Sequence, residues 1–66
     1  MKFKENDTVR ILCKKDENIN IGDIGVIIMT FEYPNEAYEV EIVDENGNFK
    51  TDSTFKSNEL ELIKEI

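Results

Sequence analysis

The strongest candidates for chemistry in this 66-residue sequence are one cysteine and a set of carboxylates, because histidine is absent. Cys13 is the only strong nucleophile, and no imidazole is present to activate it. It alternates with Val9 and Ile11, which predicts an inward-pointing structural thiol. A single cysteine also excludes an internal disulfide. The hydroxyl side chains have only carboxylates as candidate bases, so the sequence predicts no nucleophilic catalysis.

Glu39 and Glu41 form a carboxylate pair whose spacing could suit acid–base chemistry. Residues two apart on a strand point to the same face and lie roughly 7 Å apart. That separation is in range for a paired-carboxylate hydrolase, but the reaction also needs a cleft to hold the substrate. A small convex domain offers little cavity, so we expect no catalytic residues and no enzymatic activity.

Two segments imitate the start of a calcium-binding loop. Residues 16–20 and 44–48 both have the pattern Asp-x-Asn-x-Asn. A helix–loop–helix site also requires glycine at the sixth position and glutamate at the twelfth. Isoleucine occupies both positions after the first segment, and phenylalanine occupies both after the second. Each segment is therefore interpreted as a turn, and we expect no metal site and no cofactor.

The net charge of −7 is unevenly distributed along the chain. Residues 1–15 carry a net charge of +3, residues 16–49 contain nine acids and no Lys or Arg, and residues 50–66 carry −1. A field of this sign repels phosphate backbones and attracts basic proteins. We therefore expect a basic protein partner and disfavour nucleic acid. The alternative is that the acidic surface only keeps the protein soluble.

The elements that must position these residues are mostly strands, because apolar and polar side chains alternate along most of the chain. The expected strands cover residues 8–14, 24–31, 37–43 and 49–55. The segments between them, residues 16–25, 33–36 and 44–47, are rich in Asn, Asp, Gly or Pro and predict loops and turns. The last of these contains Asn46-Gly47, which is typical of a tight hairpin.

Residues 57–66 permit two interpretations. Glu, Leu and Lys favour a helix that runs to Ile66. The alternative is a tight 3-10 turn followed by a short strand with Leu60 and Leu62 pointing inward. We prefer the turn and strand, because a four-stranded meander needs its open edge covered.

Together the five strands predict an all-β fold, a small five-stranded SH3-like barrel that forms one domain over residues 1–66. The expected core consists of Val9, Ile11, Cys13, Ile24, Val26, Ile28, Tyr38, Val40, Ile42, Phe55, Leu60 and Leu62. Ile24–Phe31 is apolar on both faces, so this strand is central, bends to serve two sheets, or covers another subunit. The protein is therefore expected to be a monomer or a weak homodimer that associates through Ile24–Phe31.

Three runs carry a resemblance to a known family: Asp7-Thr8-Val9, Gly22-Asp23-Ile24-Gly25-Val26-Ile27 and the strand that starts Ala37-Tyr38-Glu39-Val40-Glu41. The sequence resembles, over residues 7–62, a family of short, uncharacterised bacterial domains of unknown function with an SH3-like barrel. Its Gly-Asp-x-Gly turn is also distantly similar to the KOW motif of ribosomal and transcription-factor barrels. Both glycines of this turn are expected to adopt positive φ. After Gly47 the sequence departs from the family pattern, because a polar segment replaces an apolar strand.

The resemblance implies no catalytic residues, and the genes of such domains look like companions of toxin or immunity loci. The leading hypothesis is a non-enzymatic protein-interaction domain, in its sharpest form an immunity or antitoxin protein that neutralises a basic toxin. The residues expected to contact the partner are Glu32, Tyr33, Glu36, Glu39, Glu41 and Asp44, with Met29 as a further apolar anchor.

Two other functions stay open. A KOW-type domain bound to nucleic acid or to the ribosome would use the N-terminal cations Lys2, Lys4, Arg10, Lys14 and Lys15. A small accessory subunit that docks on an enzyme is the other alternative.

The longest apolar run, Val26–Met29, is far shorter than the roughly 18 residues needed to span a bilayer. The first residues also lack the apolar core of a signal peptide, so we expect a cytoplasmic protein with no membrane partner.

Overall fold

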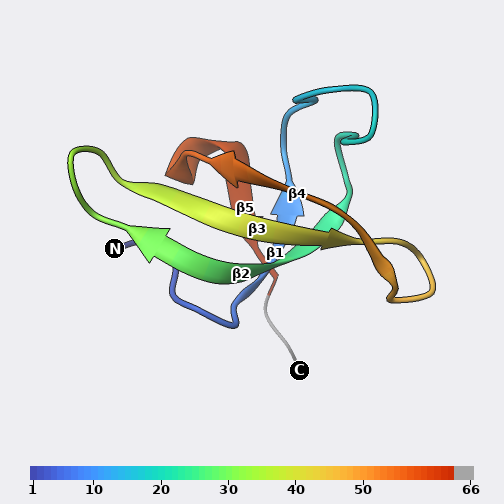
Figure 1. Ribbon diagram of the computed structural model, residues 1–66, viewed down its shortest axis with the longest axis horizontal. Coiled ribbons are helices and arrows are strands. Elements are labelled where there is room, and N and C mark those ends of the chain that lie inside the picture. The colour runs from blue at the N-terminus through green and yellow to red at the C-terminus, as the bar shows by residue number, and fades with distance from the viewer. Residues whose placement is uncertain (64–66) are drawn as a thin grey trace.

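The computed structural model describes residues 1–63, which form five strands and one 3-10 turn. The elements are β1 (Thr8–Ile11), β2 (Ile24–Phe31), β3 (Ala37–Val43), β4 (Phe49–Phe55), η1 (Ser57–Glu59) and β5 (Leu60–Leu62). All five strands join one antiparallel sheet in the order β4-β3-β2-β1-β5 (Figure 1). The predicted all-β SH3-like barrel is confirmed, including the 3-10 turn before the last strand. Of the alternatives for residues 57–66, turn and strand are correct through Leu62, and residues 64–66 lie outside the described part.

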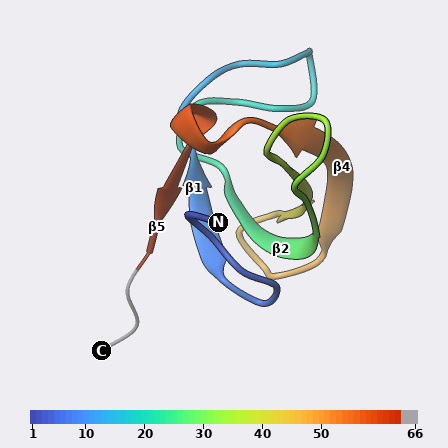
Figure 2. The ribbon, with the colours of Figure 1, turned by 90° about the vertical axis from the view of Figure 1, so that its left-hand side faces the viewer.

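The sheet curls so that its two ends lie on opposite sides of the molecule (Figure 2). β2 connects the two halves, because it pairs with β1 through its first residues and with β3 along its whole length. A register shift between Ile27 and Met29 interrupts the β2–β3 ladder, and such bulges bend a strand. β5 then pairs with β1, so that Val9 lies opposite Leu62 near the other end of the chain. None of the helical segments within residues 1–63 has the length and hydropathy that a membrane crossing requires.

The concave side of the sheet encloses the core. Its buried side chains are Phe3, Val9, Ile11, Ile19, Ile27, Tyr38, Val40, Ile42, Phe55 and Leu60. β3 shows why the strand pattern was informative, since its residues alternate strictly between buried and half-buried. No polar or charged side chain of the described residues is buried.

The prediction of the core face of β2 was wrong. Ile27 is fully buried, whereas Ile28 is 42% exposed and Ile24 and Val26 are only half-buried. Alternation could not identify the inner face, because apolar side chains occupy both faces and the bulge changes the register in the middle of the strand.

Two further core predictions at the ends of the expected strands also need correction. Leu62 is 41% exposed, because β5 is only three residues long and its last side chains lie beyond the core. Cys13 is only half-buried, because β1 ends at Ile11, but it packs against the core as a partly buried side chain.

Two core residues lie outside all five strands. Phe3 is 2% exposed and packs edge-on against Tyr38, with 5.2 Å between the ring centroids. Ile19, in the long loop before β2, is fully buried, and an isolated bridge between Asp16 and Ile19 shapes the loop around it. The N-terminal segment and the long loop therefore complete the core that the short strands leave open.

The two glycines of the Gly-Asp-x-Gly turn have different roles. Gly22 has φ of +97° and open space around it, as expected for a turn glycine. Gly25 does not have positive φ, so that part of the prediction was wrong. A Cβ atom on Gly25 would lie 2.5 Å from Cγ1 of Val40 and 3.0 Å from the backbone oxygen of Glu41. This glycine is needed for the close approach of β3 to β2.

Candidate protein-interaction site

The acidic row expected on β3 lies on the outer face of the sheet. Glu39 and Glu41 alternate with the buried residues of β3 and are half-buried themselves. The β3–β4 register sets Thr54 opposite Glu39 and Asp52 opposite Glu41. The Thr54 hydroxyl donates a hydrogen bond to Oε1 of Glu39 at 2.7 Å. No ion pair formed within residues 1–63 involves these three acids, and like charges directly opposite one another destabilise a sheet.

An apolar row on β2 lies beside the acids. Val26 is paired with Glu41 and Met29 with Glu39, and directly paired residues share a face of the sheet. Met29 is 49% exposed, and Phe31, further along β2, is 39% exposed. We refer to these side chains together as the outer face, which consists of Val26, Met29, Phe31, Glu39, Glu41, Asp52 and Thr54.

The other predicted contact residues lie in turns, and they differ in what they can offer a partner. Tyr33 is 90% exposed in the turn between β2 and β3, next to the exposed Glu32. Oε2 of Glu36, in the same turn, accepts hydrogen bonds from the Tyr38 hydroxyl and from the backbone N–H of Lys2. These hydrogen bonds lower the pKa of Glu36. The Glu36 carboxylate therefore holds the N-terminal segment in place.

Asp44 has a structural role at the β3–β4 hairpin. Its Oδ1 accepts the backbone N–H groups of Asn46 and Asn48, both at 2.9 Å, which is the Asx-type capping of a tight turn. The expected hairpin is therefore present. Of the six predicted contact residues, the structure brings only Glu39 and Glu41 together on one face, and it adds Asp52, which sequence reasoning missed.

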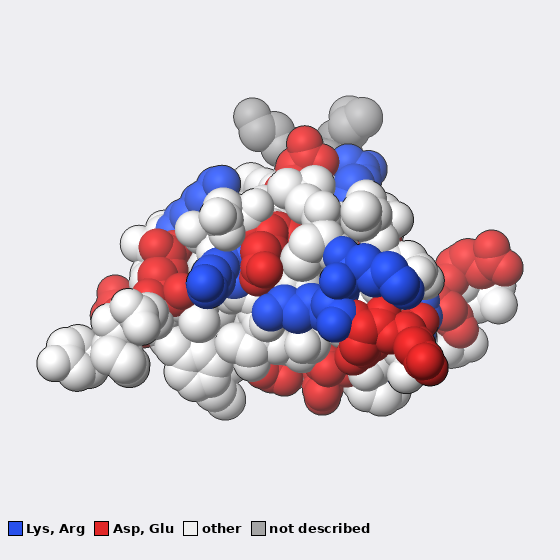
Figure 3. Space-filling view, turned by 90° about the horizontal axis from the view of Figure 1, so that it is seen from above, with Lys and Arg blue, Asp and Glu red and all other residues white. Residues whose placement is uncertain are grey.

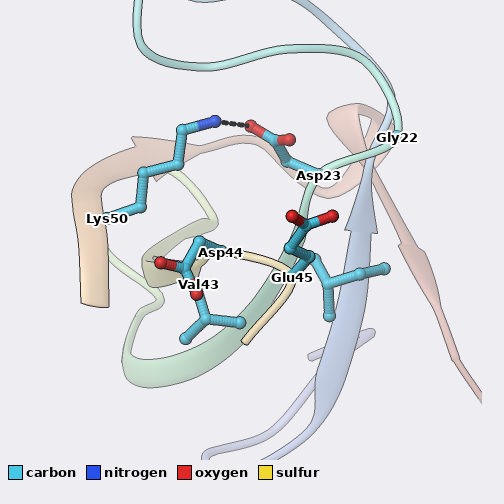
Figure 4. A pocket seen from close by; sticks show the side chains of 7 residues that line it. Gly22, Asp23, Val43, Asp44, Glu45 and Lys50 are labelled. Atoms are coloured by element: carbon cyan, nitrogen blue, oxygen red, sulfur yellow. Dashed lines mark hydrogen bonds and ion pairs between the residues drawn. The ribbon is translucent and has the colours of Figure 1, made fainter. Parts of the chain in front are cut away.

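Asp44 also lines a cavity of about 440 Å³ between the start of β2, the end of β3 and the start of β4 (Figure 4). Lys50 reaches across this cavity from β4 and donates to Oδ2 of Asp23 at 2.9 Å. Partial burial opposes ionisation of Asp23, but hydrogen bonds from the Asn20 N–H and from Lys50 outweigh it and lower the pKa of Asp23. The ion pair links β4 to the segment before β2. Within the described part of the chain, no group of three or more Cys, Asp or Glu side chains is arranged to hold a metal ion.

The N-terminal cations that a nucleic-acid interface would need are divided among separate contacts. Four of the five contact different acceptors, at distances between 2.9 and 3.5 Å: Asp7 for Lys4, Glu61 for Arg10, Asn20 for Lys14 and Glu59 for Lys15. Figure 3 shows Lys and Arg side chains across the middle of one face, with acidic side chains between and around them. The basic charge on that face is therefore partly neutralised by neighbouring carboxylates.

The surroundings of Cys13 favour its protonated thiol. Burial, and after it the neighbouring Glu59 carboxylate, raise the pKa of Cys13 above its ordinary value of 9.0. A thiol is a nucleophile only when it is ionised. The environment of Cys13 therefore favours a structural role.

The protein is expected to lose stability in acid. Asp7 accepts the backbone N–H of Lys4, and Glu59 accepts that of Lys56. These hydrogen bonds lower the pKa values of both carboxyls, as hydrogen bonds also do for Asp23 and Glu36. A carboxyl whose pKa is lowered by folding stabilises the folded state above its unfolded pKa and loses this effect as the pH falls through the folded pKa. The free energy of unfolding, measured with urea, should therefore decrease between about pH 5 and pH 3.

Asp7→Asn should make this decrease shallower, because the variant has no carboxyl to protonate at this position. Glu5→Gln is the matched control, since Glu5 is exposed and accepts no hydrogen bond from the described residues. An equally shallow decrease in both variants would show that overall charge, and not the hydrogen-bonded carboxyl, sets the acid limit.

The fold and this surface define a class: a small all-β domain of the SH3-like barrel type with an acidic and partly apolar outer face. The model of the family described as Domain of unknown function (DUF4926) matches residues 5–62. The chain therefore belongs to this family, which confirms the resemblance to uncharacterised domains noted in the sequence. No curated protein and no solved structure matches the chain significantly.

Proposed function

We propose that this protein is a non-enzymatic interaction domain that binds a basic protein through its outer face. The observation that carries the proposal is the direct opposition of Glu41 and Asp52, with no cation of residues 1–63 in ion-pair contact with either. Two like charges set opposite each other cost stability in the free domain. A Lys or Arg of a partner that reached both carboxylates would remove this cost.

The neighbouring apolar row supplies the second part of a binding surface. Met29 and Phe31 expose apolar area beside the acids, and Tyr33, in the turn that follows β2, has an almost fully exposed ring. Acidic complementarity increases the rate of encounter and is screened by salt. Buried aromatic and apolar anchors slow dissociation. The combination fits a partner that carries both cations and apolar side chains.

The sharpest form of the proposal is an immunity or antitoxin protein that neutralises a basic toxin in the bacterial cytoplasm. The net charge of −7 supports a basic partner of this kind. An accessory subunit that docks on a basic region of an enzyme would use the same face. The contrasting hypothesis is a KOW-type domain that binds nucleic acid. Against it, the N-terminal cations contact separate carboxylates and one amide.

The double variant Glu39→Lys/Glu41→Lys is expected to retain at least about tenfold less basic partner than the parent, because like charges across an interface cost several kcal/mol. The measurement is capture from a lysate of the source cells at low and moderate salt, followed by identification of the retained proteins. Circular dichroism verifies that the variant folds.

The matched control is Glu5→Lys/Glu17→Lys, which changes the net charge equally at exposed positions in other parts of the chain. An equal loss in both variants would show that net charge alone drives retention. Unchanged capture by the Glu39/Glu41 variant would refute the outer face as a docking site. Retention of RNA or ribosomes by the parent would support the KOW-type alternative.

A further inference from the structure

The outermost strand β4 has one edge without a partner strand among residues 1–63. β4 ends the strand order, and its residues Phe49–Phe55 pair with β3 along one side only. Within residues 1–63, none of the backbone hydrogen bonds outside the strand ladders involves residues 49–55. Figure 2 shows β4 on the side of the molecule away from β1 and β5. An edge of this length can accept an added strand through its backbone groups.

Alternation along β4 determines which side chains an added strand would meet. Thr51 and Ser53 are half-buried and face inward, whereas Asp52 and Thr54 are exposed and share the outer face with Glu39 and Glu41. A residue of the added strand directly opposite Asp52 would have its Cβ atom about 5 Å from that of Asp52. The middle of the β4 edge therefore presents the carboxylate of Asp52, and the carboxylate of Glu41 lies next to it on β3.

The ends of the same edge carry cations. Lys50 lies at the first end, where its Nζ is hydrogen-bonded to Asp23, and Lys56 follows the last residue of β4. Lys15 lies over the ring of Phe55 at 5.2 Å near that end and is ion-paired with Glu59 at 3.5 Å, just as Lys50 is paired with Asp23. The edge therefore matches a segment with one cation at its centre and neutral residues toward its ends.

We propose that β4 binds an extended segment of a basic partner as a sixth strand, with a single Lys or Arg opposite Asp52. This inference rests on the proposed function and adds the mode of binding. A second copy of the chain fits less well, because each copy carries a net charge of −7. If two β4 strands paired antiparallel about their middle residue, Asp52 of one copy would also lie opposite Asp52 of the other, which is destabilising.

The test is an NMR titration of the isotope-labelled protein with the end-blocked peptide Ser-Thr-Val-Arg-Val-Thr-Ser. We expect shift changes and slower amide exchange in residues 49–55. A peptide with Glu in place of Arg should bind at least about threefold more weakly, because Glu would place a like charge opposite Asp52, which destabilises a strand pair, whereas Arg places an opposite charge there, which stabilises it. Methylation of alternate peptide nitrogens should abolish binding, because it removes the donors that an added strand needs. Asp52→Asn should reduce the preference for Arg while binding persists.

Three results would overturn strand addition. The first is equal binding of the methylated peptide, which would mean docking by side chains alone and would leave the proposed function intact. The second is the absence of shift changes in residues 49–55 at millimolar peptide. The third is a dimer in sedimentation together with protected residues 49–55 before peptide is added, which would make a second copy the occupant. Failure of the proposed function is detected separately, by unchanged capture of the basic partner by the Glu39/Glu41 variant.

Discussion

Phe3→Ala is expected to lower the free energy of unfolding by about 3–5 kcal/mol, the usual range for removing a buried phenylalanine. A domain of this size has a total stability of roughly 3–10 kcal/mol, so a large fraction of the variant should be unfolded at room temperature. Phe3 is almost completely buried, packs edge-on against Tyr38, and donates its N–H to the Tyr38 hydroxyl at 3.2 Å. Its loss leaves a cavity in the core and releases the segment that closes one end of the barrel.

The measurement is urea unfolding followed by circular dichroism. Phe49→Ala is the matched control, because it makes the same chemical change at a side chain that is 60% exposed. The control should cost less than about 1 kcal/mol. If Phe3→Ala cost no more than Phe49→Ala, the N-terminal segment would not belong to the cooperative core.

Gly25→Ala is the second large effect, with an expected cost of about 2–3 kcal/mol from overpacking. The added methyl group would lie 2.5 Å from Cγ1 of Val40 and 3.0 Å from the backbone oxygen of Glu41. The first contact can be relieved by a side-chain shift, but the second requires β3 to move. Because Glu41 belongs to the outer face, this small change in the core should also weaken binding of the basic partner.

A double-mutant cycle distinguishes this contact from a general effect of losing a glycine. Val40→Ala removes the atom closest to the new methyl group, so the two changes together should cost less than the sum of their separate costs. Gly22→Ala is the comparison, because its cost comes from a φ of +97° and not from a neighbouring side chain. Val40→Ala should not rescue it. Additive costs for Gly25→Ala and Val40→Ala would contradict the packing explanation.

The sequence identified most of the fold because several strands have one polar and one apolar face. β3 is the clearest example, since Glu39 and Glu41 alternate with residues that are fully buried. β2 was assigned correctly as a strand but with the wrong inner face, because both of its faces are apolar. Gly25 was the one residue of β2 whose type indicated the inner face of this strand, since a glycine within a strand often marks a close backbone approach. Phe3 carried no periodic signal. Its position depends on contacts that only the folded chain forms: its ring packs against Tyr38 and its N–H bonds to the Tyr38 hydroxyl, while the N–H of Lys2 bonds to Tyr38 and Glu36.

The candidate site was predicted only in part, for a related reason. Alternation could place Glu39 and Glu41 on one face, but it cannot relate separate strands. A two-residue turn at Asn46-Gly47 would place Asp52 opposite Glu41. The turn that forms is longer, because the Asp44 N–H bonds to the Asn48 carbonyl, and a register shift between Ile42 and Val43 restores that pairing. The carboxylates of Glu36 and Asp44 could not be assigned to their structural roles, because those roles depend on backbone N–H groups that only the folded chain brings near.

The pairing of β1 with β5 determines when the protein can finish folding during its synthesis. β1 is made first among the strands, yet its partner across the ladder is made last, with Val9 opposite Leu62. The β2–β3–β4 meander has only neighbouring strands to pair and can form while the chain is still growing. The β1–β5 ladder must wait until Leu62 has been made, whereas the β1–β2 ladder does not depend on it, and contacts of such large sequence separation form slowly. One edge of β1 therefore stays unpaired until residues 60–62 are available, although its other edge can already pair with β2.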